Sequence, residues 1–134
     1  MSLKKGFKAL LAEAEAEIRT LSVAEARTVH GRDDVVFVDL RDPRELAREG
    51  KVPGAFHAPR GMLEFWIDPD SPYYKDVFTP GKTFVFYCQS GWRSALATRT
   101  VQDMGLPNVC HIAGGYRAWK ESGAPTETLP ERHA

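Results

Sequence analysis

The side chain in this sequence whose surroundings best suit chemistry is the thiol of Cys88, which opens the run Cys88-Gln89-Ser90-Gly91-Trp92-Arg93-Ser94. An apolar stretch at 83–87, typical of a buried strand, precedes it, and a segment with helical spacing follows. Sites in open α/β sheets lie at the carboxyl ends of the strands. There, loop N–H groups and the positive end of the next helix point toward the sulfur, which favours a nucleophilic thiolate over an inert buried thiol.

The rest of this run could hold an anion. Gly91 permits the left-handed or close-approach backbone that a tight loop needs. Arg93 adds a fixed positive charge at the rim. The N–H groups that we expect to form the cradle are those of Gln89, Ser90, Gly91, Trp92, Arg93 and Ser94. A strand, a cysteine, a short loop with glycine and arginine, and a helix form a far more specific combination than a lone cysteine.

The elements around this loop alternate between strands and helices. Strands are predicted at 35–38, 55–57, 83–87 and 109–112, and helices at 3–19, 22–29, 42–49 and 116–121. A further helix follows the Cys88 run and ends at Gly105. Ser22 with Glu25, and Asp42 with Glu45, have the spacing of helix starts. Because two of the clearest strands are uniformly apolar, the pattern indicates a parallel sheet that is covered on both faces.

The two ends of the chain differ from its centre. Residues 1–20 form an amphipathic helix whose apolar stripe must cover either the domain or a second copy of the chain, as in a homodimer. Residues 21–123 form the domain. Residues 124–134 contain two prolines and few apolar side chains, so we expect a loose tail.

Composition and charge exclude several classes of protein. The chain has 134 residues, 43% of them hydrophobic and 27% charged, which fits one globular domain. Eighteen basic residues balance eighteen acidic ones, so nothing favours nucleic-acid binding by phosphate neutralisation. No apolar run approaches a membrane span, and acids interrupt the early apolar stretch, which argues against export. Two cysteines make no disulfide framework, so we expect a cytoplasmic protein that binds no membrane.

Four landmarks follow one another between about residues 21 and 123. They are Val38-Asp39-Leu40-Arg41 with Glu45, Val52-Pro53-Gly54-Ala55, the Cys88 run, and Gly114-Gly115-Tyr116-Arg117-Ala118-Trp119. Together they resemble the rhodanese family of sulfurtransferases. The resemblance implies a three-layer α/β fold with a central, mainly parallel sheet of about five strands and helices on both faces. The N-terminal helix is an addition to it.

The resemblance also implies that Cys88 transfers sulfane sulfur. Its thiolate would take the outer sulfur of a small anionic donor such as thiosulfate or a persulfide. The Cys88 persulfide would then pass that sulfur to cyanide or to a thiol, including a protein thiol. Loop N–H groups can hold such an anion much as an oxyanion hole holds developing charge. No metal or organic cofactor is implied.

Two other functions stay open at this point. Cysteine phosphatases, including those with the rhodanese fold, and arsenate reductases are the nearest alternative. The phosphatase loop is one residue longer than the four residues that separate Cys88 from Arg93 here, and the shorter loop suits sulfur. A non-enzymatic rhodanese-like binding module is the other alternative, although members of that kind usually lack the cysteine.

Several residues outside the loop have a structural and a functional interpretation. In the family, Asp39, Arg41 and Glu45 mainly tie loops together. Arg60 follows the short strand and could bind the sulfonate of a donor or lie on the surface, whereas His57 is better explained by packing.

The aromatic segment 62–78 and the second cysteine also leave two interpretations. The segment is either a satellite of the core or a lid beside Cys88 that, with Trp92, shapes acceptor choice. Cys110 lies within a predicted strand, where core packing is favoured over a resolving role that would bring its sulfur to Cys88.

Overall fold

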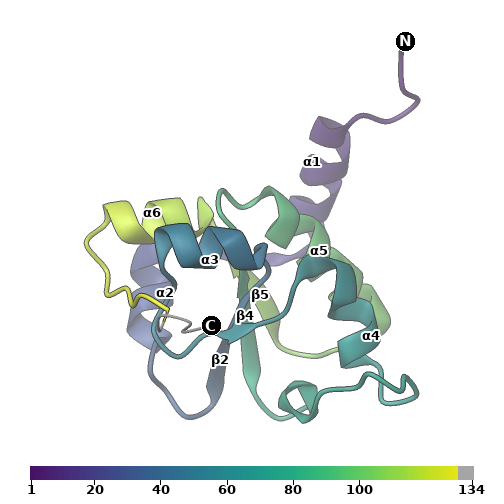
Figure 1. The fold of residues 1–134 in the computed structure, drawn as a ribbon. Helices are drawn as coiled ribbons and strands as arrows, with labels where there is room; N and C mark the ends of the chain where they lie inside the picture. Colours follow the sequence, from purple (N-terminus) through teal and green to yellow (C-terminus); the bar gives the residue numbers. More distant parts are fainter. Residues whose placement is uncertain (130–134) are drawn as a thin grey trace.

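The centre of the molecule is a parallel β-sheet (Figure 1). The computed structural model describes residues 1–129, and within them five strands pair in the order β1-β5-β4-β2-β3. Their bounds are β1 Arg19–Leu21, β2 Val35–Asp39, β3 Phe56–His57, β4 Thr83–Tyr87 and β5 Val109–Ile112. Every pair is parallel. The uniformly apolar strands predicted this, because both faces of such a sheet are buried.

Helices cover both faces of the sheet, which confirms the three-layer α/β prediction. α2 (Val23–Val29), α3 (Pro43–Glu49) and α6 (Gly115–Glu121) lie on one side, and α4 (Leu63–Ile67) and α5 (Trp92–Met104) on the other (Figure 1). Two 3₁₀ turns, η1 (Arg60–Met62) and η2 (Asp76–Phe78), lie before and after α4 in the chain. None of the helices in residues 1–129 is long and apolar enough to cross a bilayer.

Each face of the sheet has its own apolar core, and β4 contributes to both. Val85 and Tyr87 pack in the cluster that contains Trp119 of α6. Phe84 and Phe86 pack in the cluster that contains Val101 of α5. Successive strand side chains point to opposite faces, so a run without polar residues is what a central strand of this sheet requires.

The predicted helix starts are confirmed. Ser22 and Glu25 form a capping box at α2, and Asp42 and Glu45 form another at α3. Each satisfies backbone N–H groups that the first helical turn leaves without partners. α5 ends at Gly105, whose φ of 100° suits a residue without a Cβ.

The N-terminal helix α1 (Phe7–Glu17) packs on the outer side of α5 of the same chain (Figure 1). Ala14 is buried in this contact. Side chains of α5 reach the carbonyls of α1, with Arg99 donating to Glu13 O at 3.2 Å and Gln102 to Glu17 O at 2.8 Å. The domain itself therefore covers part of the stripe, and the homodimer contact stays a prediction.

Two short segments differ from the sequence-based expectation. The strand β1 was not expected, because its exposed Arg19 and Thr20 give no apolar run, yet it pairs with β5 at the edge of the sheet. Residues 124–127 are not loose. Pro125 O accepts a hydrogen bond from Trp119 Nε1 at 2.7 Å, and Glu127 forms an antiparallel bridge with Lys51. Residues 130–134, the rest of the expected tail, lie outside the described residues.

Candidate active site

The sulfur of Cys88 lies directly beyond the carboxyl end of β4 and is fully buried. The backbone N–H of Gly91 donates to Sγ at 3.2 Å, and the N–H of Ser94 donates at 3.4 Å. Both donors lie at the start of α5, where the helix dipole adds positive potential. The N–H groups of Trp92 and Arg93 stand in the first turn of α5, which has no intrahelical acceptors for them. A second sulfur or another anion can use them.

Backbone contacts from α6 hold the loop in place. Tyr116 N donates to Cys88 O at 2.8 Å, and Arg117 N donates to Gln89 O at 3.1 Å. Gly115 makes this close approach possible, because a Cβ there would stand 2.5 Å from Cys88 O, and its φ of 62° also favours glycine. Gly115 thus helps to fix the position of the cysteine, in addition to its part in the turn before α6.

Arg93 is held by a partner from another element. Its guanidinium makes two parallel hydrogen bonds to the Glu45 carboxylate of α3, at 2.7 and 2.8 Å. This contact lowers the pKa of Glu45 to about 2. Glu45 also accepts from Asp42 N at 3.0 Å in the capping box, so one carboxylate supports both α3 and the loop. The charge of Arg93 at the rim is therefore balanced by Glu45.

A buried ion pair supports the loop from below. Arg41 is fully buried and binds Asp39 at 2.7 Å, Gly50 O at 2.8 Å and the side-chain oxygen of Gln89 at 3.1 Å. Its guanidinium also lies over the Tyr116 ring, 4.3 Å from the centroid. Asp39 and Arg41 hold the loop through Gln89, which is the structural role that the family resemblance implied.

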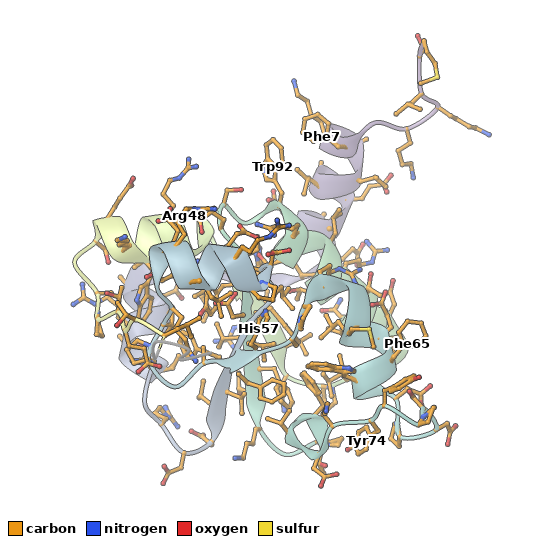
Figure 2. The ribbon with its side chains drawn as sticks, in the orientation of Figure 1. Phe7, Arg48, His57, Phe65, Tyr74 and Trp92 are labelled. Carbon is orange, nitrogen blue, oxygen red and sulfur yellow. The ribbon has the colours of Figure 1, made fainter. Side chains whose placement is uncertain are left out.

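The remaining loop side chains face outward. Ser90 is exposed. Trp92 is 57% exposed as a residue, and its ring packs against that of Phe7 of α1, with ring centroids 5.0 Å apart (Figure 2). The additional N-terminal helix thus borders the mouth of the site.

Arg60 and His57 are engaged in other contacts. Arg60 pairs with Glu64 at 2.7 Å and lines a groove between α1 and α5, next to Leu96 and Thr100. His57 Nε2 lies 2.6 Å from Arg41 O. Within residues 1–129, no hydrogen bond joins either side chain to the Cys88 loop.

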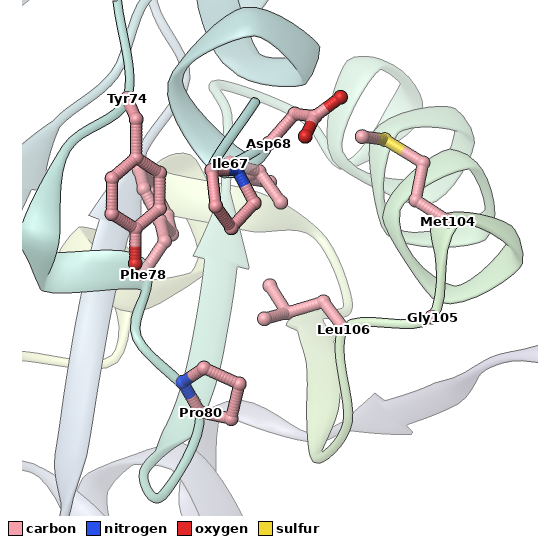
Figure 3. A pocket seen from close by; sticks show the side chains of 9 residues that line it. Ile67, Asp68, Tyr74, Phe78, Pro80, Met104, Gly105 and Leu106 are labelled. Carbon is pink, nitrogen blue, oxygen red and sulfur yellow. The ribbon is translucent and has the colours of Figure 1, made fainter. Parts of the chain in front are cut away.

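The aromatic segment 62–78 packs as a satellite of the core. Trp66 lies against Phe56, and Phe78 packs between Phe56 and Phe84. Tyr74 and Trp92 lie at opposite ends of the molecule (Figure 2). Residues of this segment line an apolar hollow of about 380 Å³ with Pro80 and Leu106, near the start of β4 (Figure 3). These contacts favour the packing interpretation over a lid.

Cys110 lies in the core, as predicted. It is fully buried in β5, and burial raises the pKa of its thiol to about 11. It pairs in register with Val85, three residues before Cys88. That separation is roughly 10 Å along a strand, beyond the reach of a disulfide. A resolving role is thereby excluded in this conformation.

His111 was missed as a neighbour of the site. It is 2% exposed, and its Nδ1 lies 2.9 Å from Ser94 Oγ, which in turn is 3.6 Å from Cys88 Sγ. Burial lowers its pKa to about 4. The signal in the sequence was a single polar side chain inside the otherwise apolar run 109–112.

Comparisons of sequence and structure relate this chain to known proteins. The sequence model of the rhodanese-like domain family matches residues 22–122. The human thiosulfate:glutathione sulfurtransferase is 30% identical over 108 residues, covering 76% of this chain and 93% of that protein. An uncharacterized Synechocystis protein is 32% identical over 107 residues, which cover 80% of this chain but only 55% of that longer protein.

A solved structure from Rhodopseudomonas palustris is 56% identical, with a TM-score of 0.92, and covers 95% of this chain and 98% of that one. It is described as a protein of unknown function and a possible tyrosine phosphatase. The match over residues 22–122 shows that the chain belongs to the rhodanese-like family. Its relatives include proteins named sulfurtransferases.

Proposed function

We propose that this protein is a rhodanese-type sulfurtransferase that carries sulfane sulfur as a persulfide on Cys88. The observation that carries the proposal is the sulfur at the start of α5, within hydrogen-bond distance of the Gly91 and Ser94 N–H groups. These donors stabilise a thiolate, and the first-turn N–H groups of Trp92 and Arg93 can receive the charge of an added sulfur.

The proposed cycle has two displacements and needs no metal or organic cofactor. The Cys88 thiolate attacks the outer sulfur of thiosulfate, so that a new S–S bond forms. The old S–S bond breaks, and its electron pair leaves with sulfite. An acceptor then attacks the outer sulfur of the persulfide, which restores the thiolate. With cyanide the product is thiocyanate, and with a small or protein thiol it is a new persulfide.

Phosphate-ester hydrolysis is the second candidate, because the 56% identical structure is described as a possible tyrosine phosphatase. Such chemistry needs a guanidinium that can bind phosphate oxygens in a fork. Here both outer nitrogens of Arg93 bind Glu45. Four residues between cysteine and arginine also leave a smaller loop than the phosphatases have. Sulfur transfer is therefore favoured, and hydrolysis of p-nitrophenyl phosphate is the direct check of the alternative.

The test of the proposal is the intact mass of the protein after thiosulfate or a thiol persulfide, and again after cyanide. We expect a gain of one sulfur atom that cyanide removes. The gain is absent in Cys88→Ser and present in the matched control Cys110→Ser. Absence of the adduct with both donors would contradict the proposal.

A further inference from the structure

His111 is a buried polar side chain that the sulfur-transfer cycle does not use. It comes from β5 and faces the α5 side of the sheet, because its neighbours Cys110 and Ile112 belong to the opposite core. Its Nδ1 lies 2.9 Å from Ser94 Oγ. Its other ring nitrogen, Nε2, is buried without a hydrogen-bond partner among the described residues.

The unpartnered Nε2 determines which nitrogen carries the proton. Burial lowers the pKa of His111 to about 4, so the ring is neutral at physiological pH and bears one N–H. Orphaned buried N–H groups are rarer in proteins than under-satisfied acceptors. The proton therefore belongs on Nδ1, where it is donated to Ser94 Oγ.

This tautomer sets the direction of the Ser94 hydroxyl. Because Oγ accepts from His111, its own proton must be donated elsewhere. Two acceptors are near, Gly91 O at 3.3 Å and Cys88 Sγ at 3.6 Å. When Cys88 is a thiolate, its charge makes Sγ the stronger acceptor. With the proton on Nε2 instead, the hydroxyl would donate to Nδ1 and present its lone pairs to the sulfur.

We propose that His111 is a positioning residue whose Nδ1–H holds the Ser94 hydroxyl as a third donor to the Cys88 thiolate, beside the N–H groups of Gly91 and Ser94. The inference rests on the proposed function in taking Cys88 as the reacting group. The charged group that faces the sulfur is the Arg93 guanidinium of α5, which is paired with Glu45 of α3. His111 faces it from β5 through Ser94 and is uncharged.

The first test reads the tautomer in the intact protein. Long-range proton–nitrogen correlation NMR of the ¹⁵N-labelled chain distinguishes a protonated Nδ1 from a protonated Nε2, and the spectrum of His111→Asn assigns the signal. We expect the proton on Nδ1 from pH 5 to 9. A proton on Nε2 in the wild-type protein would overturn the proposal.

The second test follows the alkylation rate of Cys88 by iodoacetamide against pH, with peptide mass spectrometry to locate the label. The pH of half-maximal rate should rise by about one unit in His111→Phe, because a hydrogen bond to the charged sulfur is lost. Ser94→Ala should show the same rise. His111→Asn, whose amide N–H can take the place of Nδ1–H, should stay within about 0.3 units of the wild type.

The double variant separates positioning from packing. If His111 acts through the Ser94 hydroxyl, His111→Phe has no further effect in the Ser94→Ala protein. An equal shift in both backgrounds, or none in the wild-type background, would refute the inference. Because these readouts need no sulfur donor, a protein that shows the coupling but forms no persulfide would refute the proposed function alone.

Discussion

Cys88 and Cys110 are both fully buried, and neither is in a disulfide. Their surroundings differ in the groups that meet the sulfur. At Cys88, the Gly91 and Ser94 N–H groups at the start of a helix point toward Sγ. At Cys110, Sγ lies within an apolar strand and 3.6 Å from the carbonyl oxygen of Phe84, which can only accept. Burial alone therefore does not make a cysteine inert. The supply of donors decides which sulfur can bear charge.

The two ends of β4 also differ, because one borders an apolar hollow and the other borders the Cys88 loop. The hollow of about 380 Å³ lies near the start of β4 and is lined mostly by apolar side chains. The Cys88 sulfur, which we propose as the reacting atom, lies at the opposite end of β4 in a close-fitting loop. The proposed site is thus marked by hydrogen-bond donors and not by the volume of a cavity.

The largest expected difference between the two cysteines is in their reactivity. With a pKa of about 11, Cys110 is a thiolate in roughly one molecule in 10⁴ at pH 7. We expect iodoacetamide to label Cys88 at least about 100-fold faster than Cys110 in the native protein. Peptide mass spectrometry over a time course measures both rates. In urea the two rates should converge, and similar rates in the native state would contradict the comparison.

The next test disturbs the close contact between Gly115 and the backbone of the Cys88 loop. Gly115→Ala places a Cβ only 2.5 Å from Cys88 O and forces a side chain into a positive φ. We expect a loss of about 2–4 kcal/mol in the free energy of unfolding, measured by urea denaturation. Gly31→Ala is the matched control, because its φ is 89° but no atom lies within 4 Å of the added Cβ. It should lose about 1 kcal/mol, and equal losses would show that contact with Cys88 is unimportant.

His111 makes the free energy of unfolding of the protein depend on pH. Its folded-state pKa of about 4 lies below the ordinary 6.5, so the unfolded chain takes up a proton first as the pH falls. The contribution of neutral His111 to the free energy of unfolding is full above pH 6.5. It is lost as the pH falls from 6.5 to 4, and the loss reaches about 2–3 kcal/mol. Denaturation at pH 7 and pH 4.5 should therefore show a smaller decrease for His111→Asn than for the wild type. Parallel decreases would mean that His111 is not held neutral.

The smallest expected effect concerns the ion pair between Arg93 and Glu45. Glu45→Gln should lower the free energy of unfolding by about 1 kcal/mol at pH 7, because a partly buried two-point ion pair is lost. Since the pKa of Glu45 falls from 4.5 to about 2 in the folded protein, this contribution is present above pH 4.5 and fades as the pH falls toward 2. Glu64→Gln, which breaks the (i, i+4) pair with Arg60, serves as control and should cost less than about 0.5 kcal/mol.

The sequence predicts features that depend on neighbouring residues and misses those that depend on distant ones. Capping boxes, apolar strands and the Cys88 loop are local patterns, and the structure contains all three. β1 becomes a strand only because β5 is beside it, and residues 124–127 are ordered only because Lys51 and Trp119 meet them. His111 looks like a core residue until the fold brings Ser94 to it.

The pairing of β1 with β5 also affects how the protein matures during synthesis. The paired residues Arg19 and Cys110 stand about ninety positions apart, and such distant parallel pairing folds slowly. A growing chain releases Cys88 before it releases His111 and Gly115, which complete the surroundings of the sulfur. Until those residues emerge, the Cys88 loop lacks the contacts that they supply. The surroundings that distinguish Cys88 from Cys110 are complete only after β5 and α6 have been synthesised.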